Sequence, residues 1–413
     1  MDENFENPFD IMSLASGEGL FGRGNELDWL MKGIQEQARL LLFGGEGMGK
    51  SSLLEQAGTT LAQRNEGWMI RVDLSLHQSM EEVAGVFRKA TNQLQRSPDQ
   101  AVQRGVLGDG GKRPSQGQDP TAGSSSGTKG VTRPGDLLGT LGELNAFALQ
   151  RRRSVVVALD SCHEMGRLGG GHLESILMEA VESHSATGYI LSGDERGLKT
   201  QSAAGLQMLQ NAFQTQQLGP LEPQGFAQWI DRQFQLASIV SRGVGTACVG
   251  LAGPNTGQAV ELAQRAFALS FQARFANEAT VQTALGQVVA GKNDRFAHLW
   301  AGLSANEQNV MRGIAKTGGQ GLLGPDAFRR CGLQSDEQTR SAIDSLVDKR
   351  VLDPAGPAGE FKMQSAALKQ WTLQARMSFG RDHKPDGTSG QQLSFSLNFK
   401  RSVTPSKARS NSP

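Results

Sequence analysis

The sequence predicts an α/β fold built on a mostly parallel five-stranded sheet. Three observations lead to this fold class. Five short apolar runs alternate with longer stretches of helical period. The first run opens directly into a glycine-rich loop, GGEGMGKSS (44–52), and a later run, VVVALD (155–160), closes on an acid. Alternation of this kind indicates strands joined by helices rather than an all-helical or all-β chain.

The apolar runs give the strand candidates. They are LLLF (40–43), WMIRVDL (68–74), VVVALD (155–160), YILSG (189–193) and TQQL (215–218). Strands alternating with helices in this way imply a mostly parallel sheet that is covered on both faces. Ligands of such sheets bind beyond the carboxyl ends of the strands. We therefore expect the functional residues where these runs end.

Length and composition bound the class of protein. With 413 residues the chain is too long for one ordinary domain. Its net charge of +1 is too small for a protein that coats a polyanion. Its three cysteines form no C-x-x-C pair, which disfavours a disulfide framework and a zinc site. The first residues, MDENFENPFD, are acidic where a secretory signal is basic, and no apolar run is long enough to span a bilayer. We expect a cytoplasmic protein without a membrane partner.

Composition also divides the chain. Two segments hold few large apolar residues and are dense in Gly, Ser, Pro and Gln, so they cannot offset the entropy of ordering. The expected units are a flexible N-terminus (1–19), a core (20–219) with a disordered insert (96–135), a second unit (220–296), a third unit (297–376) and a disordered tail (377–413). No internal repeat is found, which disfavours a solenoid.

The glycine-rich loop carries the most specific signal. It matches G-x-x-x-x-G-K-[ST], and it follows a strand and precedes a helical pattern, as a phosphate-binding P-loop requires. The residues predicted to surround a nucleotide here are Gly44, Gly45, Glu46, Gly47, Met48, Gly49, Lys50, Ser51 and Ser52. Backbone N–H groups would cradle phosphate, Lys50 would reach the β- and γ-phosphates, and the Ser51 hydroxyl would ligate Mg²⁺.

A second metal anchor is expected at the end of another buried strand. Asp160 closes VVVALD and fits this role, although an acid there can also merely cap the following turn. The next residue is Ser161, so the usual adjacent glutamate that polarises the attacking water is missing. Glu164 either orients that water or is a solvated carboxylate, and slow or absent hydrolysis stays open. The neighbouring Cys162 and His163 are disfavoured as a nucleophilic pair, because adjacent residues at a strand end rarely face each other.

Four further residues complete the candidate site. Ser192 ends the run YILSG and could bond the γ-phosphate or the water, while Arg196 could meet phosphate or lie solvated in a loop. Phe21 and Arg23 precede the P-loop strand where an adenine base would lie. Because no N-K-x-D segment for guanine is found, ATP is the expected nucleotide.

The third unit is predicted to be a winged helix. Ser304 and Glu307 form a capping box before an apolar stripe, a short helix follows, and residues 335–351 form a second long helix before a hairpin. That helix would be the recognition helix, but its arginines and lysines are offset by acids. Contact with DNA and contact with protein are equally compatible with this face.

Taken in order, FGRGNEL, GGEGMGKSSLL, VVVALDSCHEM, YILSGDERG and QLGPLEPQGFAQWI resemble the archaeal-type ATPase family. That family lies beside the STAND switch ATPases and the origin-recognition initiators among the AAA+ P-loop proteins. The resemblance implies strand order 5-1-4-3-2, a helical lid at 220–296 and a winged helix after it. Two departures stand out: Ser161 occupies the place of the family's glutamate, and Gln258 occupies the place where the family commonly offers an arginine to the γ-phosphate.

These observations predict an ATPase that works as an ATP-dependent molecular switch, with ATP and Mg²⁺ as cofactors and a homo-oligomer or a DNA or protein partner of the winged helix as further contacts. Two alternatives stay open. One is a DNA-binding ATPase of the initiator or loader type. The other is a pseudo-ATPase scaffold that holds nucleotide without turnover, which the serine at position 161 keeps in consideration.

Overall fold

The computed structural model describes most of the 413-residue chain. The described residues are 7–9, 20–98, 105–109, 135–169, 171–194, 196–197, 203–319, 322, 327–333, 335–354 and 360–379. The predicted flexible N-terminus, insert and tail therefore lie largely outside the described residues. Within this part of the chain, no helix combines the length and apolar character needed to cross a bilayer.

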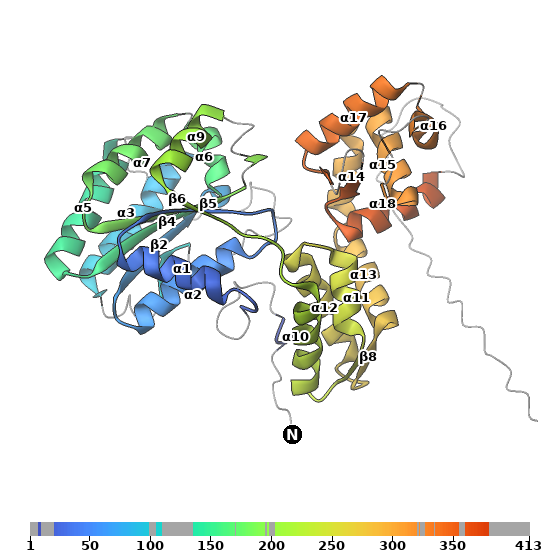
Figure 1. Cartoon of the computed structure of the whole chain (residues 1–413), viewed down its shortest axis with the longest axis horizontal. Coiled ribbons are helices and arrows are strands. Elements are labelled where there is room, and N and C mark those ends of the chain that lie inside the picture. Colours follow the sequence, from blue (N-terminus) through green and yellow to red (C-terminus); the bar gives the residue numbers. More distant parts are fainter. Residues whose placement is uncertain are drawn as a thin grey trace, which may run out of the picture. The chain divides into compact units, whose positions relative to one another are not determined.

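The centre of the core is a parallel sheet of six strands in the order β3-β2-β4-β5-β1-β6 (Figure 1). The strands are β1 (Arg39–Phe43), β2 (Gly67–Asp73), β3 (Val106–Gly108), β4 (Ser154–Asp160), β5 (Thr187–Gly193) and β6 (Gln214–Gln217). Every neighbouring pair runs parallel. The predicted α/β class with a parallel sheet is confirmed.

The expected count of five strands is wrong, because β3 adds a sixth beyond β2. Val106 pairs with Met69 and Leu107 with Ile70. The strand lies inside the segment 96–135, whose composition predicts no structure. Three residues with two apolar side chains are too few to show a period, and their burial comes from a partner strand far away in sequence. The other five strands follow the expected order 5-1-4-3-2.

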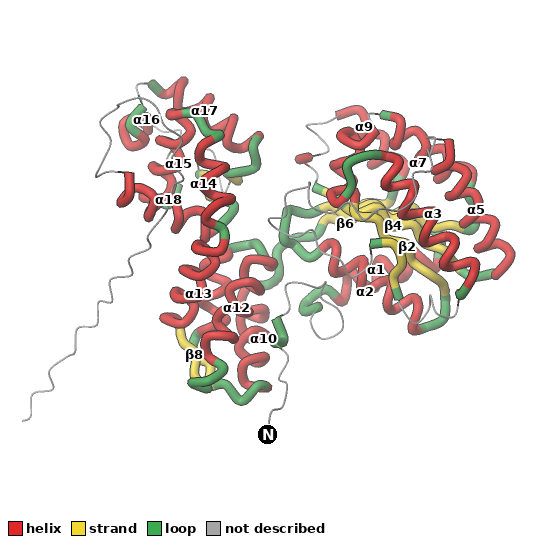
Figure 2. The backbone as a smooth tube through the Cα atoms, turned by 180° about the vertical axis from the view of Figure 1, so that it is seen from behind, coloured by secondary structure: helices red, strands yellow, loops and turns green. Residues whose placement is uncertain are grey.

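Helices cover both faces of this sheet (Figure 2). Alternate residues of each strand point to opposite faces, so Leu40 and Leu42 belong to one apolar cluster while Leu41 and Phe43 belong to the other. The first cluster includes residues of α1 (Gly24–Gln35) and α2 (Lys50–Gln63). The second includes residues of α3 (Met80–Arg96), α5 (Gly135–Arg151), η3 (Cys162–Glu164), α6 (Met165–Gly169), α7 (His172–Ser183) and α9 (Ala203–Ala212). This double cover leaves the carboxyl ends of the strands as the place for a site.

Four helices and a short strand pair follow the core. They are α10 (Pro223–Leu236), β7 (Val240–Arg242), α11 (Val244–Ala252), α12 (Thr256–Ser270), β8 (Phe275–Asn277) and α13 (Glu278–Gly291). The parallel pair β7–β8 was not expected in a unit predicted from resemblance to be helical. Phe9 is buried against Trp229, Phe234 and Phe267 of these helices.

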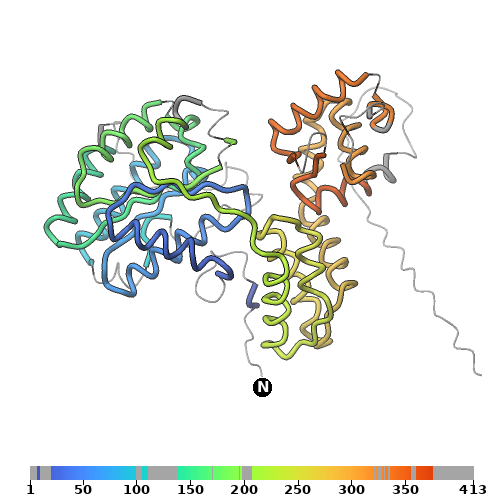
Figure 3. The backbone as a smooth tube through the Cα atoms, in the orientation of Figure 1, coloured from blue at the N-terminus to red at the C-terminus, as the bar shows by residue number. Residues whose placement is uncertain are grey.

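The last described elements are helices interrupted by an antiparallel hairpin (Figure 3). They are α14 (Asn293–Ala301), α15 (Ala305–Thr317), α16 (Ala327–Cys331), α17 (Asp336–Asp348), β9 (Leu352–Pro354), β10 (Phe361–Met363) and α18 (Ala366–Phe379). The predicted capping box is present, because Ser304 N donates to Glu307 Oε2 at 2.6 Å and Glu307 N donates to Ser304 Oγ at 3.3 Å. Helices followed by a hairpin are what the winged-helix hypothesis requires, and the assignment itself stays a prediction.

Two glycines of α11 provide a matched test of packing between α10 and α11. A Cβ on Gly245 would lie 1.9 Å from the carbonyl oxygen of Ala227, whereas a Cβ on Gly250 would meet nothing within 4 Å. We expect Gly245→Ala to lower the free energy of unfolding by about 1–3 kcal/mol through overpacking. Gly250→Ala should raise it by about 0.5–1 kcal/mol, since alanine favours helix. Urea denaturation of both variants checks this, and equal effects would contradict the close approach of the two helices.

Candidate nucleotide-binding site

The predicted P-loop joins β1 to α2. Gly47 (φ 77°) and Gly49 (φ 89°) adopt the left-handed conformation that side chains disfavour, and α2 begins at Lys50 directly after them. The Lys50 ammonium donates to the carbonyl oxygens of Gly44 at 2.7 Å and Gly45 at 2.8 Å. Burial lowers the pKa of Lys50, and the charge of Asp160 acts in the opposite direction. The N-terminus of α2 and the Lys50 ammonium therefore both lie at the loop 44–52.

Asp160 lies at the end of β4 and is 1 % exposed. Its Oδ1 accepts hydrogen bonds from the Ser192 hydroxyl and, at 3.0 Å, from the Ser161 N–H. Burial disfavours the charged form, but the Arg71 guanidinium and hydrogen bonds from Ser192 and Ser51 hold the pKa of Asp160 below its ordinary value. The structure therefore brings together three predicted site residues: Ser51 of α2, Asp160 of β4 and Ser192 of β5.

This arrangement fits a magnesium ion that is held together with a nucleotide. Ser51 and Asp160 are hydrogen-bonded to each other, as expected where a P-loop hydroxyl and a strand-end carboxylate share one ion. Among the described residues, no group of three or more His, Cys, Asp or Glu could hold a metal alone. Mg²⁺ commonly takes one or two protein groups, waters and substrate phosphates. The protein groups would be the Ser51 hydroxyl and the Asp160 carboxylate.

A buried arginine that the sequence analysis did not single out contacts Asp160 directly. Arg71, in the middle of β2, is fully buried, and its Nε and Nη2 donate to Asp160 Oδ2 at 3.2 and 2.9 Å. Its Nη1 donates to the backbone carbonyl of Asp109 at 3.1 Å. A charge buried this deeply requires such partners. The signal in the sequence was an arginine inside the apolar run WMIRVDL.

Asp73, the last residue of β2, is a second buried acid that the sequence analysis missed. It is the register partner of Asp160 on β4, and its Oδ2 lies 3.5 Å from Arg71 Nη2. Its Oδ1 accepts from the backbone N–H of Ser75 at 3.1 Å and from the Ser75 hydroxyl at 2.7 Å. Burial and the nearby Asp160 charge raise the pKa of Asp73. Two acids thus end β2 and β4, and both lie beside Arg71.

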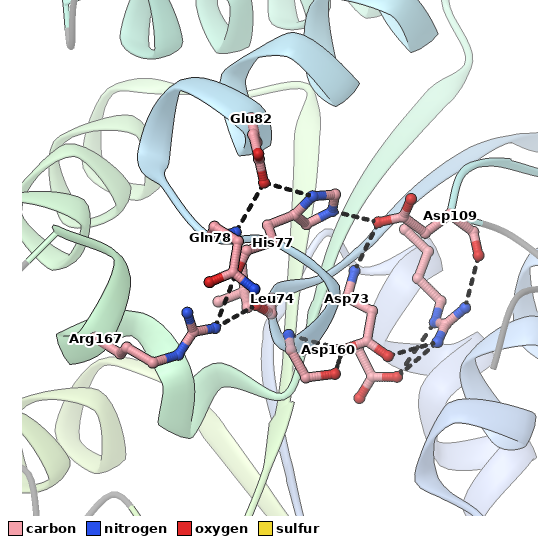
Figure 4. Close-up of polar contacts among 10 residues, drawn as sticks. Asp73, Leu74, His77, Gln78, Glu82, Asp109, Asp160 and Arg167 are labelled. Atoms are coloured by element: carbon pink, nitrogen blue, oxygen red, sulfur yellow. Dashed lines mark hydrogen bonds and ion pairs between the residues drawn. The ribbon is translucent and has the colours of Figure 1, made fainter. Parts of the chain in front are cut away.

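The polar network continues to the edge strand β3. Asp109 follows that strand, and its Oδ2 accepts from the Asp73 N–H at 3.2 Å and lies 2.8 Å from His77 Nε2 (Figure 4). Asp109 and Asp73 are both buried. The unexpected strand β3 therefore supplies groups that hold β2 and the turn after it in place.

Glu164 lies in the turn η3 and is engaged away from Asp160. Its Oε2 accepts from Arg167 Nε at 2.6 Å, and its Oε1 lies 3.6 Å from His163 Nε2. Arg167 in turn donates to the carbonyl oxygens of Leu74 and His77. Cys162 is fully buried, and burial raises the pKa of its thiol, which gives no support to a nucleophilic role.

Arg196 is not placed with the other candidates. Its side chain is exposed and its Nη1 donates to Asp353 Oδ1 at 2.6 Å. Phe21 stacks with Phe226 and Trp229, at centroid distances of 6.1 and 5.8 Å.

Arg23 is buried and supports the P-loop itself. Its Nη2 donates to the carbonyl oxygens of Met48 at 3.0 Å and Gly219 at 2.7 Å, and its Nη1 pairs with Glu26. These hydrogen bonds indicate that Arg23 stabilises the conformation of the loop. A direct contact with nucleotide stays a prediction for both Phe21 and Arg23.

The first turn of α12 contacts the P-loop. Gly257 N donates to the carbonyl oxygen of Gly47 at 2.9 Å, and Asn255 Nδ2 donates to that of Glu46 at 3.2 Å. Gln258, at the position where the resembled family carries arginine, donates from its amide to the carbonyl oxygen of Gln364 and accepts from Ala366 N. This turn therefore touches both the P-loop and the segment before α18.

Comparison with solved structures finds proteins of similar fold. The Walker-type ATPase of Pyrococcus abyssi is similar with a TM-score of 0.61 and 16% identity, over 89% of this chain and 99% of that one. The ORC2 protein of Aeropyrum pernix, in its ADPNP–ADP complexes, has a TM-score of 0.56 and 13% identity, over 90% and 98%. At these identities the likeness concerns the fold. No protein-family profile matches the chain, and no curated protein sequence matches it.

The dependence of two buried acids on Arg71 gives a stability prediction. Arg71→Met leaves Asp160 and Asp73 without their cation, so we expect the free energy of unfolding to fall by about 3–5 kcal/mol. Arg232→Met, at an exposed position of α10, is the control and should change it by less than about 0.5 kcal/mol. Chemical denaturation measures both. A loss below about 1 kcal/mol at position 71 would show that the pairing contributes little.

Proposed function

We propose that this protein binds Mg·ATP at the loop 44–52 and acts as an ATP-dependent molecular switch. The observation that carries the proposal is the convergence of Lys50, Ser51, Asp160 and Ser192 at the carboxyl ends of β1, β4 and β5. Such convergence after parallel strands is what phosphate and Mg²⁺ binding requires. The fold shared with Walker-type ATPases supports the same conclusion.

Each residue has a role that follows from its position. Backbone N–H groups of the loop and the N-terminus of α2 would bind phosphate oxygens, and Lys50 would exchange its two carbonyl partners for them. Mg²⁺, held by the Ser51 hydroxyl and the Asp160 carboxylate, would supply positive charge to the phosphates. Ser192, hydrogen-bonded to Asp160, would hold that carboxylate in the orientation that the metal needs.

The switch is supported by the contacts of α12. The carbonyl groups of Glu46 and Gly47 accept bonds from Asn255 and Gly257, so a P-loop that changes its backbone on binding phosphate also changes the partners of α12. Gln258 in the same turn bonds Gln364 and Ala366. A ligand with different affinities for two arrangements of these bonds shifts their populations. A change of bound nucleotide would thereby alter the hydrogen bonds between α12 and the segment before α18.

We propose hydrolysis to ADP and phosphate as the step that resets the switch. The site offers a phosphate loop, a metal anchor and buried carboxylates beside it. The scaffold alternative, in which nucleotide is held without turnover, predicts a stable ATP complex. Measuring ATP turnover by the purified protein distinguishes the hydrolysing switch from the scaffold.

The nucleotide site gives a direct binding prediction. Lys50→Ala removes the ammonium that contacts phosphate, so we expect affinity for Mg·ATP to fall by about 10–100-fold. Lys32→Ala, at an exposed position of α1, is the matched control and should leave affinity unchanged. Isothermal titration calorimetry measures both variants. Wild-type protein that does not bind Mg·ATP would refute the proposed function.

DNA binding of the initiator type is the weaker alternative. Duplex binding rests on cationic contacts to phosphate. The face of α17 that would enter a groove carries one arginine and four acids: Asp336, Glu337, Arg340, Asp344 and Asp348, which line one surface hollow.

We therefore expect a dissociation constant for duplex DNA weaker than about 1 µM at physiological salt. Fluorescence anisotropy at about 50 and about 200 mM salt, with and without Mg·ATP, checks this. Tighter binding that depends on ATP and falls steeply with salt would favour the initiator alternative instead.

A further inference from the structure

We propose that Asp73, on the strand next to Asp160, is the carboxylate that orients the attacking water. The inference rests on the proposed Mg·ATP binding and names a residue for the hydrolytic step. It addresses a gap at this site, since the residue after Asp160 is Ser161, which has no carboxylate.

The other acids near the end of β4 do not fill this gap. Glu164 is bonded to Arg167 at 2.6 Å, and its own N–H donates to the carbonyl oxygen of Ser161 within a tight turn. Asp194 follows β5, and its Oδ2 lies 3.9 Å from Arg350 Nη1. Ser161 itself is in the left-handed conformation (φ 57°) and donates its N–H to Asp160. Neither carboxylate ends a strand at the level of Asp160, because Glu164 lies in the turn after β4 and Asp194 lies beyond the end of β5.

Asp73 has the position that the missing glutamate would need. Its strand and β4 are parallel, and Asp73 pairs in register with Asp160, so both acids end their strands at the same level. Neighbouring strands are about 4.8 Å apart, which is close to the spacing of consecutive residues along a chain. Both carboxylates also lie within 3.5 Å of the same atom, Nη2 of Arg71. In this chain the second carboxylate is on the neighbouring strand, at Asp73, instead of on the residue directly after Asp160.

The surroundings hold Asp73 in one orientation. The Ser75 N–H and hydroxyl both donate to its Oδ1, and its own N–H donates to Asp109. The side chain of Ser161 also hydrogen-bonds to it. A carboxylate held by several donors on rigid strands suits the ordering of a reactant.

The reaction balances without another reactant. A water molecule hydrogen-bonded to Asp73 attacks the γ-phosphorus of ATP, and the new P–O bond forms as the bond to the β–γ bridging oxygen breaks. The electron pair of the broken bond stays on ADP, which leaves as the anion. The proton of the water passes through the Asp73 carboxylate to the phosphate product. Positioning of this kind contributes about 10²–10⁴-fold to rate.

The test separates binding from turnover in the full-length protein. Asp73→Asn keeps the side-chain shape and one acceptor for Ser75, so we expect affinity for Mg·ATP within about threefold of wild type and single-turnover hydrolysis at least about 100-fold slower. Protein incubated with Mg·ATP and then desalted should retain ATP in the variant and ADP in the wild type, as read by chromatography of the released nucleotide.

Three further variants serve as controls. Ser75→Ala removes the hydroxyl that donates to Asp73 but keeps the backbone N–H donor and the carboxylate, so it should slow hydrolysis by no more than a few-fold. Glu164→Gln removes the rival carboxylate and should do the same. Asp73→Glu keeps the charge but displaces it by one methylene. It should bind normally and turn over at least about tenfold more slowly, and it stands in if Asp73→Asn fails to fold.

The outcomes are distinct. Wild-type turnover by Asp73→Asn or Asp73→Glu, or a loss of turnover in Glu164→Gln alone, would overturn the role of Asp73. Wild-type protein that binds Mg·ATP without hydrolysing it would also overturn that role and leave the binding site intact. Absence of Mg·ATP binding by wild type would instead refute the function on which the inference rests.

Discussion

The burial of charge at the end of β4 is the constraint on which this site depends. Asp160 is 1 % exposed, and an unpaired carboxylate in such a place would take up a proton. The Arg71 guanidinium prevents this with two hydrogen bonds from the neighbouring strand. Arg71 must then be buried too, and it needs Asp73 and the Asp109 carbonyl as further partners. One buried carboxylate thus accounts for a polar layer across three strands.

That layer explains why the sheet has a sixth strand. β3 contributes little apolar surface, but the residue that follows it supplies one acceptor to Arg71 and another to the Asp73 N–H. Pairing with β2 brings both acceptors to the right level. The edge strand is therefore part of the site as well as of the sheet, and His77 closes the network beyond it.

The sequence predicted what is local. Five strands, the P-loop and the two capped helices of the C-terminal unit follow from runs, spacings and caps that lie within a few residues of one another. Arg71, Asp73 and Asp109 were missed because their roles come from strand register across gaps of 36 to 89 residues. The arginine inside an apolar strand was the one visible sign, since an unpaired charge there is not tolerated.

Strand register determines which side chains meet at the site. A motif describes order along the chain, whereas the catalytic groups of a parallel sheet meet at an edge where neighbouring strands end together. Asp73 and Asp160 occupy equivalent levels on adjacent strands, although their positions in the sequence differ by 87 residues. A serine in place of the expected glutamate therefore removes a carboxylate from one strand without removing it from the edge. The shared Arg71 lies beside both acids at one point of the sheet.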